Sequence, residues 1–179
     1  YSDVNWVWGF WRWHSYGEVL ANYYDYDYDD LLGQVRSLVF RHMTLQQQVM
    51  HPIVADLQGQ LRVRVQLEDQ GRLDWDAFVQ ELILEREIVE YEYKVAFPRW
   101  RRFRGYLGYR YQRRIDWRVQ EEERNTNDRI YTTGPLIKFS YRWDHRPVIS
   151  WEAAFLNVTQ MDGQEYAITR MQLNASWQF

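Results

Sequence analysis

The sequence contains no cysteine. This absence excludes disulfide bonds, a thiolate nucleophile and a cysteine-ligated zinc site, but it leaves the compartment open because many exported proteins also lack cysteine. Long apolar runs are missing too: no segment approaches the roughly 18 to 20 consecutive apolar residues that a membrane-spanning helix needs. Helical insertion into a membrane is therefore excluded, whereas strands that cross a membrane need only about 9 to 11 residues of alternating character.

Neither sign of charge dominates the composition. The net charge is −3, and the basic residues concentrated at 99–118 are balanced by acidic runs at 25–30 and 121–123. This balance argues against a nucleic-acid partner. With 179 residues the chain suits a single domain, 1–179, because typical domains contain about 100 to 200 residues. It begins at Tyr1 with no signal-peptide pattern, which fits a mature exported chain and fits equally a segment of a longer sequence.

Aromatic residues are the one compositional excess. The 10 tryptophans and 14 tyrosines exceed what a core of this size ordinarily uses, since both side chains carry a polar atom that needs a partner when it is buried. Such side chains favour a boundary between apolar and polar surroundings. Two boundaries fit: the headgroup level of a bilayer, and a surface that binds a sugar or a protein partner.

Apolar and polar residues alternate along most of the chain. In FRGYLGYRYQRRIDWRVQ (103–120), the odd-numbered positions are mostly aromatic or aliphatic, and the even-numbered positions carry four arginines. A period of two predicts a strand with one apolar and one charged face. The same alternation predicts further strands at 61–68, 89–97, 137–144, 149–155 and 170–179.

Turns separate the predicted strands, and one segment of the N-terminal third has an ambiguous pattern. We predict turns at 68–72, 97–99, 121–134, 145–147 and 161–164. The segment 30–50 fits either a strand or one face of a helix that ends before Pro52. If every element is a strand, the chain contains nine strands. Bacterial single-chain barrels have even strand numbers, so we expect at least one element to be misassigned.

The alternation is compatible with two folds that place the apolar face against different surroundings. In a soluble, aromatic-rich β-barrel or α+β domain that binds a ligand or glycan, the apolar face packs inward. In an antiparallel transmembrane β-barrel of about 8 to 10 strands, that face meets lipid and the charged face fills the lumen. The alternating run at 103–120 spans about 60 Å, far more than the usual strand, which favours the membrane barrel.

The C-terminal segment MQLNASWQF (171–179) has apolar residues at alternate positions and ends in phenylalanine. It resembles the C-terminal signal strand of bacterial outer-membrane β-barrel proteins. The resemblance implies an all-β transmembrane barrel in the outer membrane of a Gram-negative envelope, surrounded by the lipid bilayer and lipopolysaccharide. It also implies recognition by the barrel-assembly machinery, with Trp177 and Phe179 in the assembly signal, and contact with other envelope proteins.

On this interpretation the charged face lines the lumen of the barrel. Its basic residues outnumber its acidic ones, and charges in a narrow lumen must be paired and hydrogen-bonded. Two functions follow: a structural or interaction protein whose interior is plugged by ion pairs, or a narrow pore that favours anions. The residues predicted to line the lumen are Arg62, Arg64, Glu90, Glu92, Lys94, Arg104, Arg110, Arg114, Asp116, Arg118, Lys138, Arg142, Glu152 and Arg170.

Signals for metal binding and catalysis are weak. Asp25, Asp27 and Asp29 alternate within an acidic run, but the flanking residues depart from the helix-loop-helix calcium pattern. We expect neither a metal nor a cofactor. The pairs His14–Ser15 and Ser140–His145 suggest a serine hydrolase, such as an outer-membrane lipid-modifying enzyme. Neither pair has a family motif, and adjacent strand residues point to opposite faces, so we favour a barrel without catalysis.

Overall fold

The computed structural model describes residues 1–24, 38–54, 56–74, 79–98, 102–120, 123–142 and 148–176. The strands are β1 (Ser2–Trp8), β2 (Trp11–Tyr24), β3 (Leu38–Val54), β4 (Leu57–Asp74), β5 (Val79–Ala96), β6 (Phe103–Gln120), β7 (Glu123–Arg142), β8 (Val148–Gln160) and β9 (Glu165–Ser176). The predicted all-β class is confirmed for these residues. No described segment forms a helix long and apolar enough to cross a membrane.

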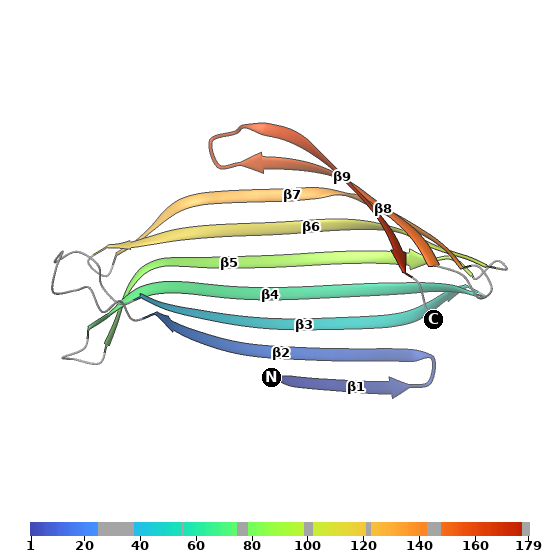
Figure 1. Cartoon of the computed structure of the whole chain (residues 1–179), viewed down its shortest axis with the longest axis horizontal. Coiled ribbons are helices and arrows are strands. Elements are labelled where there is room, and N and C mark those ends of the chain that lie inside the picture. The colour runs from blue at the N-terminus through green and yellow to red at the C-terminus, as the bar shows by residue number, and fades with distance from the viewer. Residues whose placement is uncertain are drawn as a thin grey trace.

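The nine described strands form one antiparallel sheet, in which each strand pairs with the next along the chain. The long strands β3 to β7 contain 17 to 20 residues and lie side by side (Figure 1). In the same view β8 and β9 turn across the sheet at a steep angle (Figure 1). β1 and β9 form the two edges and do not pair with each other in the described residues, so the sheet is open there.

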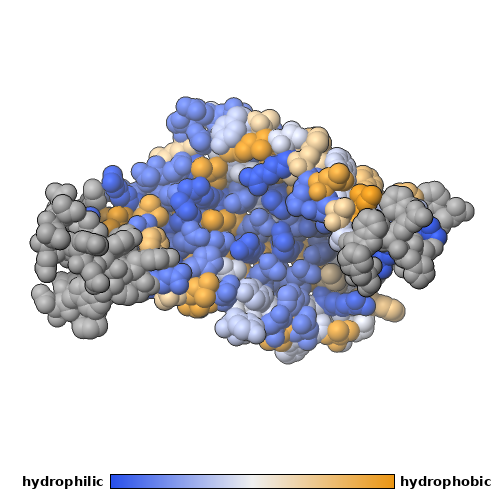
Figure 2. Space-filling model, viewed as in Figure 1, coloured by the Kyte–Doolittle hydropathy of each residue, from blue (hydrophilic) through white to orange (hydrophobic). Residues whose placement is uncertain are grey.

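Side-chain alternation gives the sheet two chemically different faces. The cross-strand register aligns Glu92 with Arg110 on one face, and it aligns their neighbours Tyr93 and Tyr109 on the other. We call the face of Glu92 the inner face and the face of Tyr109 the outer face. Figure 2 views the molecule from one side and shows hydrophilic residues across the middle of the sheet.

The charged inner face is the enclosed one. Glu92 and Asp116 are only 1% and 4% exposed. On the same face, Leu136 and Leu156 form a small buried apolar cluster against Tyr106. Polar and apolar groups are therefore packed together on this side, and the described residues bury few large hydrophobic side chains.

Large apolar side chains on the outer face remain exposed. The exposed fraction is 45% for Leu107, 55% for Tyr109, 49% for Phe139 and 71% for Leu173. In a water-soluble domain the large apolar side chains are the ones that folding removes from solvent. The distribution of burial over the two faces is therefore the reverse of that in a soluble β-barrel.

Aromatic rings on the outer face cover a glycine. Trp11, His51 and Tyr93 stack in a row, with ring centroids 5.2 and 6.0 Å apart. Gly59 lies beneath them: a Cβ there would come within 2.4 Å of the His51 ring and 2.6 Å of the Tyr93 hydroxyl. The missing side chain lets three rings from β2, β3 and β5 lie against the sheet. Such coverage of a strand glycine by aromatic rings stabilises the local register.

The helix considered for 30–50 is wrong for its described part. Residues 38–50 belong to β3 and pair with both β2 and β4. The ambiguity arose because Leu45 and Val49 are four residues apart, a spacing that fits a helix face and one face of a strand equally well. Residues 30–37 lie outside the described residues.

Two predicted turns are also wrong. The segment 68–72 lies inside β4, and the pairing of β4 with β5 shifts register between Gln70 and Gly71. The described part of 121–134 belongs to β7, which begins at Glu123. Both segments carry polar residues on both faces, a pattern that is typical of loops. By contrast, the predicted turn at 161–164 is confirmed, with Gly163 at a φ of 83°.

Candidate functional site

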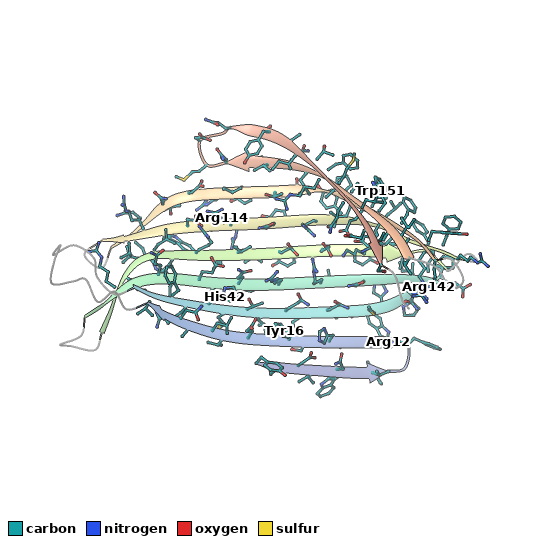
Figure 3. All side chains as sticks on the ribbon, in the orientation of Figure 1. Arg12, Tyr16, His42, Arg114, Arg142 and Trp151 are labelled. Carbon is teal, nitrogen blue, oxygen red and sulfur yellow. The ribbon has the colours of Figure 1, made fainter. Side chains whose placement is uncertain are left out.

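The candidate site is the network of charges on the inner face of β4, β5 and β6. These strands each contain 18 residues and stay in continuous register over their middle sections, which places charged side chains in rows across the sheet. Figure 3 labels Arg114 on β6 and His42 on β3, which belong to one part of this network.

Glu92 lies at the centre of the first cluster, and its side chain is fully buried. Its carboxylate lies 3.0 Å from Arg62, 2.5 Å from Lys94 and 2.7 Å from Arg110. The neighbouring Glu90 accepts a hydrogen bond of 2.7 Å from Arg62. Two carboxylates thus lie among three cations, which leaves one positive charge in excess, and every charge in the cluster has an opposite charge beside it.

Asp116 organises the second cluster, nearer the β6–β7 turn. Arg86 contacts its carboxylate at 2.9 Å and Arg114 at 2.5 Å. Arg86 also reaches Glu68 at 3.3 Å, and Glu68 lies 3.3 Å from His42. Burial alone would raise the pKa of the Asp116 carboxyl, but hydrogen bonds from Arg114 and Arg86 outweigh burial and lower this pKa to about 2.

The lowered pKa predicts an acid-dependent contribution of Asp116 to stability. A carboxylate with a depressed folded pKa stabilises the fold above its unfolded pKa, and the contribution is lost as the pH falls toward the folded pKa. We expect Asp116→Asn to lower the free energy of unfolding at neutral pH by about 2 kcal/mol or more. The difference from wild type should shrink between about pH 4 and pH 2, as measured by denaturant titrations across that range. A difference that stays constant over that range would contradict the prediction.

All the residues predicted to line a lumen share the inner face. Ion pairs join most of them, including Lys138 and Glu152 at 3.2 Å. The remaining five, all arginines, have no ion-pair partner among the described residues. Arg64 is half-buried, whereas the other four are exposed: Arg104, Arg118, Arg142 and Arg170.

Sequence reasoning missed several members of the network. Arg86 was absent from the predicted set, although it joins Glu68 to Asp116. The signal was weak because Arg86 shares its face with Leu84 and Ile88, so the segment shows no clean alternation. His42 was missed for a similar reason, since its strand was ambiguous between helix and sheet.

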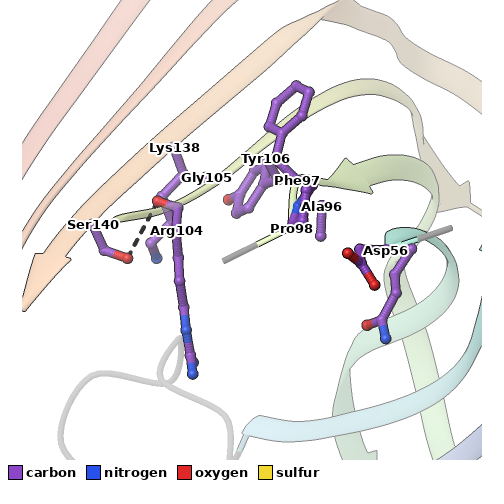
Figure 4. Close-up of a pocket in the computed structure, with 10 residues that line it drawn as sticks. Asp56, Ala96, Phe97, Pro98, Arg104, Gly105, Tyr106, Lys138 and Ser140 are labelled. Atoms are coloured by element: carbon purple, nitrogen blue, oxygen red, sulfur yellow. Dashed lines mark hydrogen bonds between the residues drawn. The ribbon is translucent and has the colours of Figure 1, made fainter. Parts of the chain in front are cut away.

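A recess of about 660 Å³ lies at one end of the inner face (Figure 4). Arg104, Lys138 and Tyr106 contribute side chains to its wall, and the Ser140 hydroxyl donates a hydrogen bond of 3.4 Å to the Arg104 carbonyl. Lys138 is held by Glu152, as described above. The recess therefore lies beside the ion pairs of the inner face, and its wall includes the cations Arg104 and Lys138.

Of the two histidine–serine pairs considered for catalysis, the structure describes both members of one, His14 and Ser15, and these two side chains do not meet. His14 contacts Asp3 at 2.8 Å on the inner face, whereas Ser15 accepts a hydrogen bond of 2.7 Å from Gln47 on the outer face. The expected separation of His14 and Ser15 is confirmed. His145 lies outside the described residues, so its pairing with Ser140 stays untested.

The residues considered for metal binding and those of the predicted assembly signal lie outside the described part of the chain. This applies to Asp25, Asp27, Asp29, Trp177 and Phe179. Among the residues that the structure does describe, no group of three or more acidic or histidine side chains could hold a metal ion.

The outer face divides into an apolar band and a charged end. Along β4 it carries Leu61, Val63, Val65 and Leu67 and then changes to Asp69. At that level the outer face carries the ion pairs Arg41–Asp69 at 2.8 Å and Arg124–Glu85 at 2.5 Å. A third outer-face pair, Arg113–Glu87 at 2.5 Å, begins earlier, because the register places Glu87 opposite Leu67 and Arg113 opposite Val89. The strands are therefore longer than the apolar band.

Comparison with protein-family models, curated protein sequences and solved structures found no match for this chain.

Proposed function

We propose that this chain forms the wall of a bacterial outer-membrane β-barrel that acts as a narrow, anion-favouring pore. One observation carries the proposal: the charged face of the sheet contains fully buried carboxylates, whereas large apolar side chains of the opposite face are exposed. Glu92 is 1% exposed, whereas Leu107, on the opposite face of the neighbouring strand, is 45% exposed. A membrane barrel has this polarity, with lipid against the apolar face and a polar lumen inside.

The free energy of solvation favours lipid over water at the outer face. Burial of apolar surface stabilises a protein by about 25 cal/mol per Å², so exposing a face of aliphatic and aromatic side chains to water forfeits the main driving force of folding. The inner face, with its buried ion pairs, supplies no comparable hydrophobic gain. Hydrocarbon around the outer face removes this deficit.

The height of the apolar band fits a bilayer. On β4 the band runs from Leu57 to Leu67, about 34 Å along the strand at about 3.4 Å per residue. A strand tilt of about 40° reduces this to about 26 Å, close to the roughly 25 Å apolar band of outer-membrane barrels. The ion pairs beyond Leu67 would then lie outside the membrane.

The two sheet edges set a condition for the proposal. Backbone groups do not remain unpaired in hydrocarbon, so β1 and β9 must be covered in a membrane. In an all-antiparallel order of nine strands these two run in the same direction. A barrel built only from antiparallel pairs therefore requires an odd number of further strands between them, which agrees with the even strand numbers of bacterial barrels.

The charge balance of the inner face supports the preference for anions. Every acid in the predicted lumen set has a cation within ion-pair distance, such as Glu152 with Lys138 and Asp116 with Arg86. The five arginines without a partner among the described residues leave a positive surplus. A cationic pore lining favours anions.

Two measurements test the proposal. We expect the exported chain to leave membranes only with detergent and to run as a compact folded species in SDS until it is heated. In a planar bilayer under a KCl gradient, the reversal potential should have the sign of chloride selectivity. A chain that stays soluble and monomeric without detergent would refute the membrane assignment. Detergent dependence without conductance would instead favour a plugged barrel with a structural role.

A further inference from the structure

Arg64 differs from the other half-buried cations of the inner face. Its Nε atom is buried and has no hydrogen-bond partner, and the described residues provide no ion pair to this side chain. Glu90 lies directly opposite in the register, but its carboxylate binds Arg62 at 2.7 Å. The acid nearest to Arg64 along the register is therefore already engaged.

Uncommitted donors surround Arg64 on the β3 side. The register places Gln46 opposite Arg64 and Gln48 opposite Arg62. Among the described residues neither glutamine amide has a side-chain hydrogen bond, and the Nε atom of Arg62 is also buried without a partner. We call Gln46, Gln48, Arg62 and Arg64 the Gln–Arg patch. It presents amide and guanidinium N–H groups side by side on one face.

The flanking strand does not satisfy these donors. On β2, Tyr16 lies beside Gln46, but its hydroxyl donates a hydrogen bond of 2.8 Å to Glu18. His14 lies beside Gln48, and its ring contacts Asp3 at 2.8 Å. The groups next to the Gln–Arg patch are thus occupied by their own acids, and the patch keeps its hydrogen-bonding capacity for a ligand.

We propose that the Gln–Arg patch binds a small oxyanion of the phosphate class. Guanidinium groups present a planar fork of donors that matches the oxygen atoms of such anions, and charge-assisted hydrogen bonds of this kind are strong. Neutral amide donors add hydrogen bonds without adding charge. An oxyanion here would offset the charge of Arg64, which has no ion-pair partner among the described residues, and would accept hydrogen bonds from the neighbouring amide groups.

Inorganic phosphate is the probe for this site. The folded full chain in detergent micelles should melt at a higher temperature as phosphate is added at constant ionic strength, because a ligand that binds only the folded state stabilises it. For Arg64→Gln we expect phosphate affinity to fall by roughly tenfold or more, as for loss of a hydrogen bond to a charged group. Phosphate line broadening in ³¹P spectra provides a direct second readout.

Matched variants separate binding from general charge effects. Arg170→Gln removes an exposed cation of the same face outside the patch and should leave phosphate affinity unchanged. Arg64→Lys keeps the charge but loses the planar fork of donors, and Gln46→Met keeps the volume but loses the amide. Both substitutions should weaken phosphate binding. They test the site even if Arg64→Gln does not fold. No stabilisation of the wild type, or equal stabilisation of all variants, would overturn the assignment.

This inference rests on the proposed lumen, but the two can fail separately. Binding is measured in micelles and needs no ion flow. Phosphate binding that depends on Arg64 in a protein without conductance would support the site and refute the pore. An anion-selective conductance in a protein whose phosphate affinity does not change in Arg64→Gln would support the pore and overturn the site.

Discussion

Replacing Glu92 by glutamine is expected to lower the free energy of unfolding by about 3–5 kcal/mol, the usual effect of removing one partner from a buried ion pair. Glutamine keeps the shape of the side chain but removes the charge. Arg62 and Arg110 would then share the carboxylate of Glu90, and Lys94 would lose the ion pair that it makes with Glu92. Denaturant titrations of the folded chain in lipid vesicles or micelles would measure the loss.

Glu152→Gln is the matched control for this change. It is the same substitution on the same face, but the Glu152 side chain is 34% exposed and has a single cation, Lys138, at 3.2 Å. Exposed ion pairs contribute about 0–1 kcal/mol, so this variant should be close to wild type. Equal effects of the two substitutions would show that the Glu92 cluster is not an enclosed ion-pair centre.

Leu107→Arg is expected to destabilise the protein by about 2–4 kcal/mol in a bilayer, as found for a cation on the lipid face near the midplane of a barrel. Leu107 lies in the middle of the apolar stretch of the β6 outer face, between Phe103 and Tyr111. The reason is the solvation of a guanidinium group, which hydrocarbon does not provide. The measurement is reversible unfolding in lipid vesicles.

The control for Leu107→Arg is an arginine substitution on the same face but nearer the expected membrane surface. Val19 is 71% exposed on the outer face, and it pairs with Met43, next to the Arg41–Asp69 pair at the end of the apolar band. A cation near the membrane surface costs only about 0–1 kcal/mol, so Val19→Arg should be mild. If Leu107→Arg also changes the stability by less than about 0.5 kcal/mol, as surface substitutions in water do, the outer face does not meet lipid.

The sequence predicted the middle of the sheet well. Residues 61–68, 89–97, 103–120 and 137–144 alternate cleanly, and each lies mostly or wholly within one strand. These strands carry apolar side chains on one face and charges on the other, and a two-residue period leaves little choice of structure. For the same reason the predicted lumen residues proved to share a single face.

Prediction failed where the two faces of a strand are chemically alike. The inner face of β3 carries Thr44 and Gln46, and its outer face carries Gln47 among apolar residues, so the contrast between the faces is weak. At the charged end of the sheet, outer-face ion pairs such as Arg124–Glu85 make strand residues look like loop residues. Pairing with neighbouring strands, which local sequence does not encode, keeps these segments extended.

The sequence by itself determined which side chains share a face, because alternation along an extended chain is a local property. It did not determine which face is enclosed, since that depends on how the sheet curves. Nor did it determine which acid binds which base, because ion pairs such as Arg86–Asp116 join strands that are 30 residues apart in the chain. Only the tertiary structure, through register and curvature, buried Glu92 among its cations and left Arg64 without an ion pair to any residue that the structure describes.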